Sequence, residues 1–442
     1  MSNEAPKSPR RSGGLRDIGK MFGGSQSSLR QFGILGALVA IIIIFQVLTD
    51  GRTLLPGNVI NIVNANAYVL ILAIGMVMVI IAGHIDLSVG SVAAFTGIVV
   101  AIAMTDWSLP WPIAVLIGLG VGALIGAWQG FWVAYVGVPA FIVTLAGMLL
   151  FRGANQFVGD STSLTTPPEF KVLGGGYLPD FGPDFGYSNP TLILGLLAAL
   201  AVIVQEVMLR RKQVRTGTER APLWVSIVKV LLLVGVIVFA SLLFGGGRVG
   251  TSVPVSGLIL IAFVLIYSFV ANRTVIGRHI YAVGGNWHAA ELSGVNIKRT
   301  NFFVMMNMSV LAAIAGMIFV SRSQASGPQD GTGWELDAIA AVFIGGAAVS
   351  GGIGTVIGSI VGGLVIAVLN NGLQLLGAGQ DQVQMIKGLV LLLAVAVDVI
   401  SKRSGGRSII SRFQRGSTTP DEPAVKPATD SAEASARPPA AG

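Results

Sequence analysis

Long apolar runs separated by short polar segments are the feature that most constrains the fold of this 442-residue chain. A transmembrane helix needs about 20 mainly apolar residues, because it crosses roughly 30 Å of hydrocarbon. Asp, Glu, Lys and Arg make up only 11% of the residues, whereas a soluble domain has about 25%. The sequence therefore predicts an all-α, polytopic helical membrane protein.

Twelve apolar segments stand out, and we expect about 10–12 of them to cross the membrane. They lie at residues 32–49, 66–83, 88–104, 112–135, 140–158, 191–208, 222–244, 253–271, 300–320, 337–349, 353–376 and 383–400. The tenth is too short to span comfortably. It and the third are candidates for half-helices or broken helices, which lipid-facing backbone does not tolerate but a bundle interior does.

The basic residues indicate the orientation of the chain. Of the 29 Lys and Arg residues, 22 fall in residues 1–30, 209–221, 272–299 and the stretch from 401, and only four fall in the opposite set of loops. Cytoplasmic loops carry such an excess of Lys and Arg, so we predict a multi-pass protein of the plasma (cytoplasmic) membrane with both termini inside. The remaining three, Arg152, Lys229 and Lys387, lie within or at the ends of apolar segments.

The same pattern predicts three regions. Residues 1–30 are expected to be a disordered basic cytoplasmic tail, and residues 401–442, rich in Ser, Pro, Ala and charge, a second one. Residues 31–400 form the transmembrane domain, which includes a cytoplasmic segment at 273–300.

Composition also excludes several classes of function. The formal charge of +8 comes from bases spread over short loops rather than one soluble face, so we expect no nucleic-acid partner. With no Cys and three His, no metal site and no cofactor are expected. Residues 14–20 match the G-x-x-x-x-G-K pattern of a phosphate loop, but Met21 stands where Ser or Thr ligates magnesium. We interpret the match as chance, so the energy for any transport has to come from elsewhere.

Glycine recurs every fourth residue in two of the apolar segments. The series are Gly118, Gly122, Gly126 and Gly130, and Gly354, Gly358 and Gly362. Small residues at this spacing let a neighbouring helix backbone approach closely, so tight packing is the main interpretation. A role in a moving gate is the alternative.

Residues 83–90, Gly-His-Ile-Asp-Leu-Ser-Val-Gly, interrupt two apolar segments. A carboxylate within a membrane needs a partner or water. Asp86 and Ser88 either cap the following helix from a short inner loop or belong to a broken-helix element near a pathway. A proton relay from His84 to Asp86 is a weaker alternative, because no further chain of intramembrane acids accompanies the pair.

The cytoplasmic segment 273–300 has the pattern of a short helix. Asn286 is a helix cap, Ala289, Ala290 and Leu292 supply an apolar side, and Gly294 ends the helix. Such a helix either lies on the membrane surface or docks on a cytoplasmic partner.

This segment carries a resemblance to a known family. Residues 284–296, Gly-Gly-Asn-Trp-His-Ala-Ala-Glu-Leu-Ser-Gly-Val-Asn, resemble the inner-loop motif of sugar permeases of ABC importers in the ribose, galactose and xylose group. Further matches lie at 85–91, 141–148, 151–153, 335–341 and 345–346, so the resemblance covers about residues 30–400. The basic loop 209–221 and the additional apolar pair around it are most similar to the xylose-type branch. Glu291 and His84 depart from the family pattern, which has Arg at the first position and Gly or an acid at the second.

The resemblance implies the ABC importer permease fold and a function. The chain would be the transmembrane permease subunit that brings a monosaccharide, with a xylose-like pentose favoured, into the cytoplasm, and it would not itself be an enzyme. Two permease copies, as a homodimer in lipid, would work with cytoplasmic ABC ATPase subunits and an extracytoplasmic sugar-binding protein. The residues implied to couple to the ATPase are Gly285, Asn286, Ala289, Ala290, Glu291, Leu292 and Gly294.

Sugar passage calls for polar side chains along the path. The candidates are Asp86, Ser88, Asn64, Trp128, Gln129, Asn155, Asn307 and Asn371, with Asn66, Gln156, Asn370 and Gln374 on the same chemical grounds. Each amide fits a helix-packing role equally well. An ion-gradient-driven secondary transporter of a small polar solute is the main alternative, supported by a faint echo of residues 85–87 at 336–338, and a channel is a third.

Overall fold

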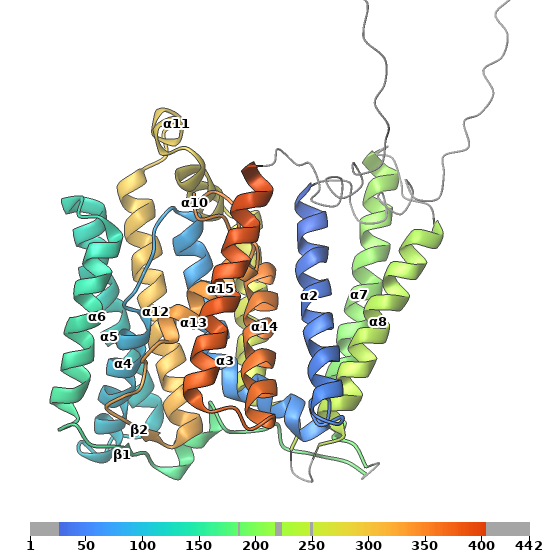
Figure 1. Ribbon diagram of the computed structural model, residues 1–442, viewed down its shortest axis with the longest axis horizontal. Helices are drawn as coiled ribbons and strands as arrows, with labels where there is room; N and C mark the ends of the chain where they lie inside the picture. Colours follow the sequence, from blue (N-terminus) through green and yellow to red (C-terminus); the bar gives the residue numbers. More distant parts are fainter. Residues whose placement is uncertain (1–25, 184–185, 217–222, 248–250, 404–442) are drawn as a thin grey trace, which may run out of the picture. The chain divides into compact units, whose positions relative to one another are not determined.

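A computed structural model gives the fold of the chain and describes residues 26–183, 186–216, 223–247 and 251–403 (Figure 1). The chain divides into two compact units, Met1–Val395 and Ala396–Gly442, and the features below belong to the first. The tails predicted over residues 1–30 and 401–442 fall almost wholly outside the described residues, so their predicted disorder stays a prediction.

The described chain is almost entirely helical. Its α-helices are α2 (Gln26–Leu48), α3 (Pro56–Ile81), α4 (Val89–Thr105), α5 (Trp111–Phe131), α6 (Ala140–Val158), α7 (Asn189–Thr216), α8 (Leu223–Gly245), α9 (Val255–Arg273), α10 (Val275–Gly285), α11 (Trp287–Leu292), α12 (Ile297–Ser323), α13 (Trp334–Ile344), α14 (Val356–Leu375) and α15 (Gln380–Arg403). A π-helix, η1 (Trp132–Val136), continues α5, and a 3-10 helix, η2 (Pro168–Val172), follows β1 (Leu164–Thr165). Each of the twelve apolar segments corresponds to one of these helices, which confirms the all-α prediction. Within the part of the chain that the structure describes, eight helices are long and apolar enough to cross a membrane.

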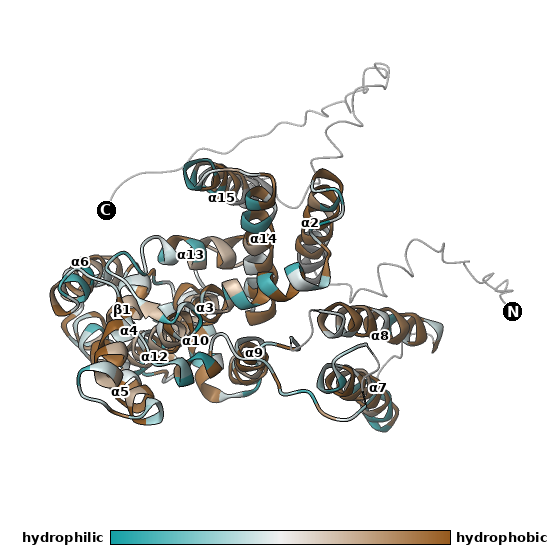
Figure 2. Ribbon diagram, turned by 90° about the horizontal axis from the view of Figure 1, so that it is seen from below, coloured by the Kyte–Doolittle hydropathy of each residue, from teal (hydrophilic) through white to brown (hydrophobic). Residues whose placement is uncertain are grey.

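Helix α3 is the centre of the bundle, with α9, α12, α13 and α14 packed around it (Figure 2). Its apolar window is 83% buried inside the chain. The helix begins ten residues before the predicted boundary at 66, because Pro56 suits a first helical turn and the asparagines that follow find partners on other helices. Asn58 exchanges two side-chain hydrogen bonds with Asn371, at 2.8 and 2.9 Å.

The glycine series bring helix backbones into contact. On α5, a Cβ at Gly122 would lie 2.6 Å from Ala313 Cβ, and one at Gly126 would lie 2.6 Å from Met306 Cα, both on α12. On α14, a Cβ at Gly362 would lie 2.1 Å from the Ala341 carbonyl oxygen of α13. These contacts are the tight packing that the spacing predicts, and any larger side chain would separate the helices.

Two short helices lie inside the bundle, as expected for the third and tenth apolar segments. Helix α13 has 11 residues, about 16 Å, which is about half of the roughly 30 Å of hydrocarbon. It follows β2 (Ala325–Ser326), which pairs antiparallel with β1 in the register Leu164↔Ser326. Helix α4 has 17 residues and is largely buried. Buried surroundings allow both chain breaks at membrane depth.

Helices α7 and α8 form a hairpin at the periphery of the bundle (Figures 1 and 2). The apolar windows of the two helices are only 6% and 0% buried, so lipid would surround most of the hairpin. Lys229 on α8 pairs with Glu206 on α7 at 3.1 Å. This hairpin is the additional apolar pair that flanks the basic loop at 209–221.

Candidate functional site

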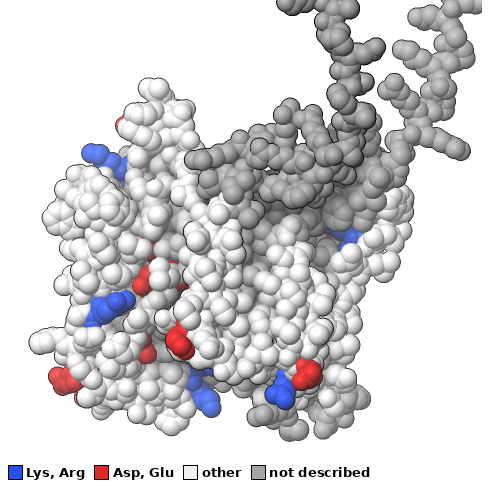
Figure 3. Space-filling view, viewed as in Figure 1, with Lys and Arg blue, Asp and Glu red and all other residues white. Residues whose placement is uncertain are grey.

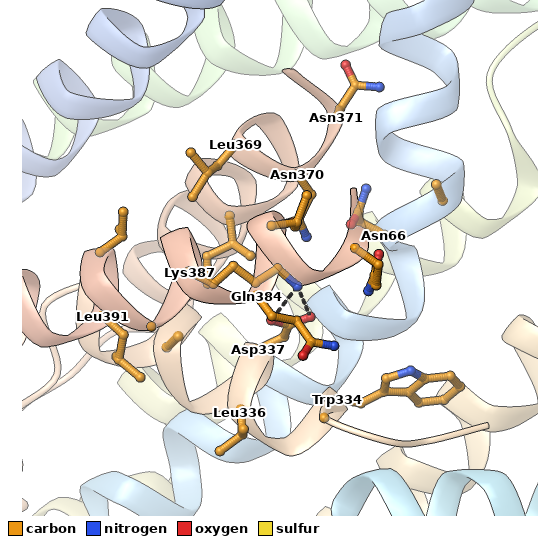
Figure 4. A pocket seen from close by; sticks show the side chains of 18 of the residues that line it. Asn66, Trp334, Leu336, Asp337, Leu369, Asn370, Asn371, Gln384, Lys387 and Leu391 are labelled. Carbon is orange, nitrogen blue, oxygen red and sulfur yellow. Dashed lines mark hydrogen bonds and ion pairs between the residues drawn. The ribbon is translucent and has the colours of Figure 1, made fainter. Parts of the chain in front are cut away.

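A cavity of about 660 Å³ lies between α3, α6, α13, α14 and α15 (Figure 4). Its polar lining residues are Asn61, Asn66, Tyr68, Arg152, Thr332, Glu335, Asp337, Asn370, Asn371, Gln374, Gln380, Gln384 and Lys387. The first half of α3, the last turns of α14 and the first turns of α15 contribute, so the cavity lies toward one end of the bundle. A concave site with convergent polar groups is the usual form of a small-molecule site.

The cavity wall holds two pairs of opposite charge. Lys387 Nζ on α15 donates to both carboxylate oxygens of Asp337 on α13, each at 3.0 Å (Figure 4). Arg152 on α6 faces Glu335 on α13, with 3.7 Å between Nη2 and Oε1. The two pairs sum to zero net charge. Charged side chains are few and scattered on the face of the chain seen in Figure 3, which is what a membrane environment demands because isolated charges there are costly.

Amide side chains supply most of the remaining polarity. Asn66, Asn370, Asn371 and Gln384 lie around the Asp337–Lys387 pair in the close view (Figure 4). An amide offers both donors and acceptors, and none of these groups carries charge. The cavity therefore suits a neutral solute that is rich in hydroxyl groups.

Of the eight main candidates for the sugar path, Asn371 lines this cavity. Asp86, Ser88 and Gln129 instead join one buried network: the Ser88 hydroxyl donates to Asp86 Oδ1 at 2.7 Å, and Gln129 Nε2 donates to Ser88 Oγ at 2.7 Å. The Ser309 hydroxyl on α12 reaches Gln129 Oε1 at 3.4 Å. This network ties the start of α4 to α5 and α12.

The other four candidates also have neighbours within the bundle. Asn64 accepts a hydrogen bond from the Ser256 hydroxyl at 2.9 Å, Asn307 accepts one from Tyr267, and Asn155 donates to the Gly327 carbonyl at 3.2 Å. Trp128 is 39% exposed and lies edge-on to Phe151. These contacts match the helix-packing alternative, and a role in the path stays a prediction.

The expected side-chain cap of α4 is not formed. Ser88 occupies the cap position of α4 but makes no side-chain cap hydrogen bond. Its backbone N–H donates to Asp86 Oδ1 at 2.8 Å, so the carboxylate closes a local turn. Asp86 is fully buried and takes its bonds from Ser88, not from His84.

Helix α11 is the short helix predicted within residues 273–300. Asn286 Oδ1 accepts from the Ala289 N–H at 3.0 Å, which confirms the predicted cap, and Gly294 ends the turn with φ +84°. The predicted apolar side is divided, because Ala290 faces inward at 5% exposure whereas Leu292 is 91% exposed. Glu291, Ala289 and Gly285 are exposed as well.

The position of α11 favours docking over lying flat. The helix stands beyond the ends of α6 and α12 (Figure 1), and the Trp287 ring stacks on His288 at 3.5 Å. A helix that lay along a membrane would present one long apolar face, whereas this six-residue helix presents Leu292 at its end. The helix therefore protrudes from the end of the bundle.

Backbone contacts connect α11 to the cavity through what we call the glycine joint, formed by Gly284, Gly351, Gly352 and Ile81. A Cβ at Gly284, just before α11, would lie 1.6 Å from the Ile81 carbonyl oxygen at the end of α3. The Gly352 N–H donates to the same oxygen at 2.8 Å, and a Cβ at Gly351 would lie 2.9 Å from the Gly284 oxygen. Helix α3 and the helices on either side of residues 345–355 also line the cavity.

A tyrosine reinforces this region. The Tyr281 hydroxyl on α10 donates to the Gly354 carbonyl at 2.7 Å, and burial raises the pKa of this phenol above its usual value. The bond holds α10 to the loop between α13 and α14.

The charge pairs are what sequence reasoning missed. Arg152 and Lys387 stood out as bases inside apolar segments, but Glu335 and Asp337 were not assigned to them. The available signal was the need of each intramembrane base for an opposite charge. This signal predicts that each base has an acidic partner, but it does not identify which Asp or Glu that partner is.

Comparison with known proteins agrees with these features. Residues 58–395 match the family described as branched-chain amino acid transport system / permease component. The chain is 37% identical over 386 residues to the xylose transport system permease protein XylH of Haemophilus influenzae, covering 87% of this chain and all of that protein. It is 38% identical to XylH of Escherichia coli strain K12 over 86% of this chain and 95% of that protein. It is also 32% identical to the ribose import permease protein RbsC of E. coli strain K12 over 82% and 92% of the two chains.

These relatives confirm the resemblance to sugar permeases that residues 284–296 and the accompanying motifs indicated. No solved structure matches the chain.

Proposed function

Because this chain belongs to the family of branched-chain amino acid transport system permease components, we propose that it is the transmembrane subunit of an ATP-binding-cassette importer for a monosaccharide. A xylose-like pentose is the favoured solute, since the relatives named above include xylose permeases at 37–38% identity. A separate ATPase subunit supplies the energy. The permease itself makes and breaks no covalent bond.

The observation that carries the proposal is the cavity between α3, α6, α13, α14 and α15. Its charges cancel in pairs and its other polar groups are mainly amides, so it favours a neutral polyhydroxy solute over an ion. The carboxylates Asp337 and Glu335 each face a base. This pairing disfavours the alternative of an ion-driven transporter, in which a carboxylate has to exchange a proton or cation during the cycle.

The coupling role falls to α11. Leu292 and Trp287, exposed at 91% and 51%, offer an apolar contact to a groove of the ATPase, and Asn286 and Gly294 fix the ends of the helix. Gly285, Ala289, Ala290 and Glu291 complete the surface and its support. Closure of the ATPases would then move α11, and the glycine joint would carry that movement to α3 and to the α13–α14 loop.

Orientation and assembly belong to the same proposal. With both termini in the cytoplasm, α11 lies on the inner side, and the cavity lies in the outer half of the membrane where a sugar-binding protein releases its load. A second copy of the chain completes the permease, in a bilayer whose lipid surrounds the α7–α8 hairpin. Two states of such a bundle, biased differently by ATP and by the loaded binding protein, are sufficient for alternating access.

Reconstitution tests the proposal. The chain is placed in proteoliposomes with an ATPase subunit and a binding protein of a sugar ABC importer, and uptake of labelled D-xylose and D-ribose is measured with and without ATP. ATP-dependent uptake that needs all three components is expected. Uptake by the chain alone under a proton or sodium gradient would establish the secondary-transporter alternative instead.

A further inference from the structure

The two ion pairs in the cavity wall differ in whether their charged atoms are hydrogen-bonded to each other. Lys387 binds both oxygens of Asp337 at 3.0 Å, so each carboxylate oxygen has a donor. The Arg152–Glu335 pair has its nearest atoms 3.7 Å apart, which is beyond hydrogen-bond distance. The second pair therefore attracts electrostatically without forming a bond.

Three buried polar atoms near this second pair lack a hydrogen-bond partner within the described part of the chain. They are Nη2 of Arg152, Oε2 of Glu335 and Oδ1 of Asn155, which lies one turn from Arg152 on α6. Glu335 and Asn155 are only 6% and 2% exposed. Buried polar atoms in native proteins are nearly always hydrogen-bonded, and charged ones pay the largest penalty when they are not.

Packing holds these groups in place. A Cβ at Gly90 on α4 would lie 2.5 Å from Glu335 Oε2 and 2.2 Å from the Gly331 carbonyl oxygen, so α4 presses against the start of α13. Asn155 Nδ2 donates to the Gly327 carbonyl at 3.2 Å and to that of Pro328 at 3.4 Å, which anchors the segment leading into α13. The side chains consequently cannot close on each other without moving these elements.

We propose that Arg152 and Glu335 form a solute-contacting subsite that recognises adjacent oxygens of a neutral polyhydroxy ligand. A ligand hydroxyl donates to the Glu335 carboxylate, and a neighbouring ligand oxygen accepts from the Arg152 guanidinium, since both side chains line the cavity. This inference rests on the proposed function, because it places the sugar in the same cavity. An inorganic ion fits poorly, since either sign of charge meets one repelling partner.

The two ion pairs have different roles, one in contacting the solute and one in holding the cavity wall. A hydroxyl group is both donor and acceptor, so two neighbouring oxygens of a pentose match one unpaired acceptor and one unpaired donor. Asp337 and Lys387 already satisfy each other and serve to fix α13 against α15. Arg152 and Glu335 are thus the specificity-determining residues of the cavity, and Asp337 and Lys387 position its wall.

Direct binding of D-xylose to the full chain in lipid nanodiscs tests the subsite, with saturation-transfer NMR as the readout. We expect wild-type protein to bind, and R152Q/E335Q to bind about tenfold more weakly or worse, because hydrogen bonds to charged groups are lost. The matched control is E206Q/K229Q, which removes the same two charges from the ion pair of the α7–α8 hairpin, outside the cavity. The control is expected to keep wild-type affinity.

Deoxy analogues of xylose sharpen the test. Removing the hydroxyl that donates to Glu335 should weaken binding to wild type about tenfold and should weaken binding to E335Q less, because the amide is a neutral hydrogen-bond partner. If the double variant does not fold, R152K, which keeps the charge but not the guanidinium geometry, serves in its place and should lose affinity in the same way.

The outcomes separate this inference from the proposed function. The subsite would be overturned if R152Q/E335Q bound xylose with wild-type affinity or if wild-type protein bound no xylose. It would also be overturned if every deoxy analogue lost as much affinity for the variants as for wild type. In each case, ATP-dependent uptake by the reconstituted importer would leave the proposed function standing. Absence of uptake by the wild-type importer would instead count against the proposed function itself.

Discussion

Replacing Lys387 with Met should destabilise the chain substantially, because it leaves the Asp337 carboxylate without its donor. The two side chains are 22% and 18% exposed, and Lys387 donates to both carboxylate oxygens. Met keeps most of the length and apolar surface of Lys, so the change removes the charge and little packing.

The magnitude follows from the surroundings of the pair. Removing one partner of a fully buried ion pair costs about 3–5 kcal/mol. Partial exposure of both side chains reduces this figure through solvent screening. Asp337 also lies in the first turn of α13, where the helix dipole offsets about 0.3–1 kcal/mol. We therefore expect a loss of about 2–3 kcal/mol in the free energy of unfolding.

Unfolding in mixed dodecyl maltoside–SDS micelles, followed by tryptophan fluorescence, measures this loss. The double variant D337N/K387M should recover at least half of it, because no charge is then left unpaired. Lys229→Met is the matched control: Glu206 keeps a second basic neighbour, Arg210 at 3.8 Å, so the loss should be smaller than at Lys387. Equal losses at the two lysines, or no recovery in the double variant, would refute the reasoning.

Three further predictions concern coupling and packing. Gly284→Ala, whose Cβ would meet the Ile81 carbonyl oxygen at 1.6 Å, should lower ATP-driven uptake about tenfold or more, whereas Gly285→Ala, whose Cβ meets nothing within 4 Å, should not. Equal uptake in the two variants would remove the glycine joint from the mechanism. Leu292→Asp should abolish co-purification of the ATPase while membrane insertion and unfolding remain unchanged, since the side chain is 91% exposed; retained co-purification would contradict docking at α11. Gln129→Leu leaves Ser88 Oγ without its donor and should lower the free energy of unfolding by about 1–3 kcal/mol, and no loss in the same micelle titration would show that the network is dispensable.

The coupling predictions use Leu292 for a structural reason. From the sequence alone, Ala290 and Gly294 are also positions where a bulky charged residue is expected to prevent ATPase association. Ala290 is buried and Gly294 has a positive φ, so replacements there also disturb the fold of the segment. Leu292 separates contact with a partner from folding of α11.

Sequence periodicity and length accounted for most of the secondary structure. Each apolar segment is a helix, because an apolar run of this length has few other ways to satisfy its backbone within a membrane. Glycine at every fourth position placed the α5–α12 contact on one helix face, and the cap at Asn286 is a local pattern. The start of α3 at Pro56 was not evident, since Asn58 and Asn64 interrupt the apolar run and their partners, Asn371 and Ser256, are distant in sequence.

The order of residues was enough to show that this chain is a membrane bundle, that most of its bases lie in loops, and that Arg152, Lys229 and Lys387 lie within or at the ends of apolar segments. The partners of these three bases became known from the packed helices: they lie opposite the carboxylates of Glu335, Glu206 and Asp337 respectively. Two of the pairs line the cavity and the third joins the peripheral hairpin. Helix formation depends on residues a few positions apart, whereas these pairs depend on how whole helices rotate and pack against one another, and a single sequence carries no local signal for that.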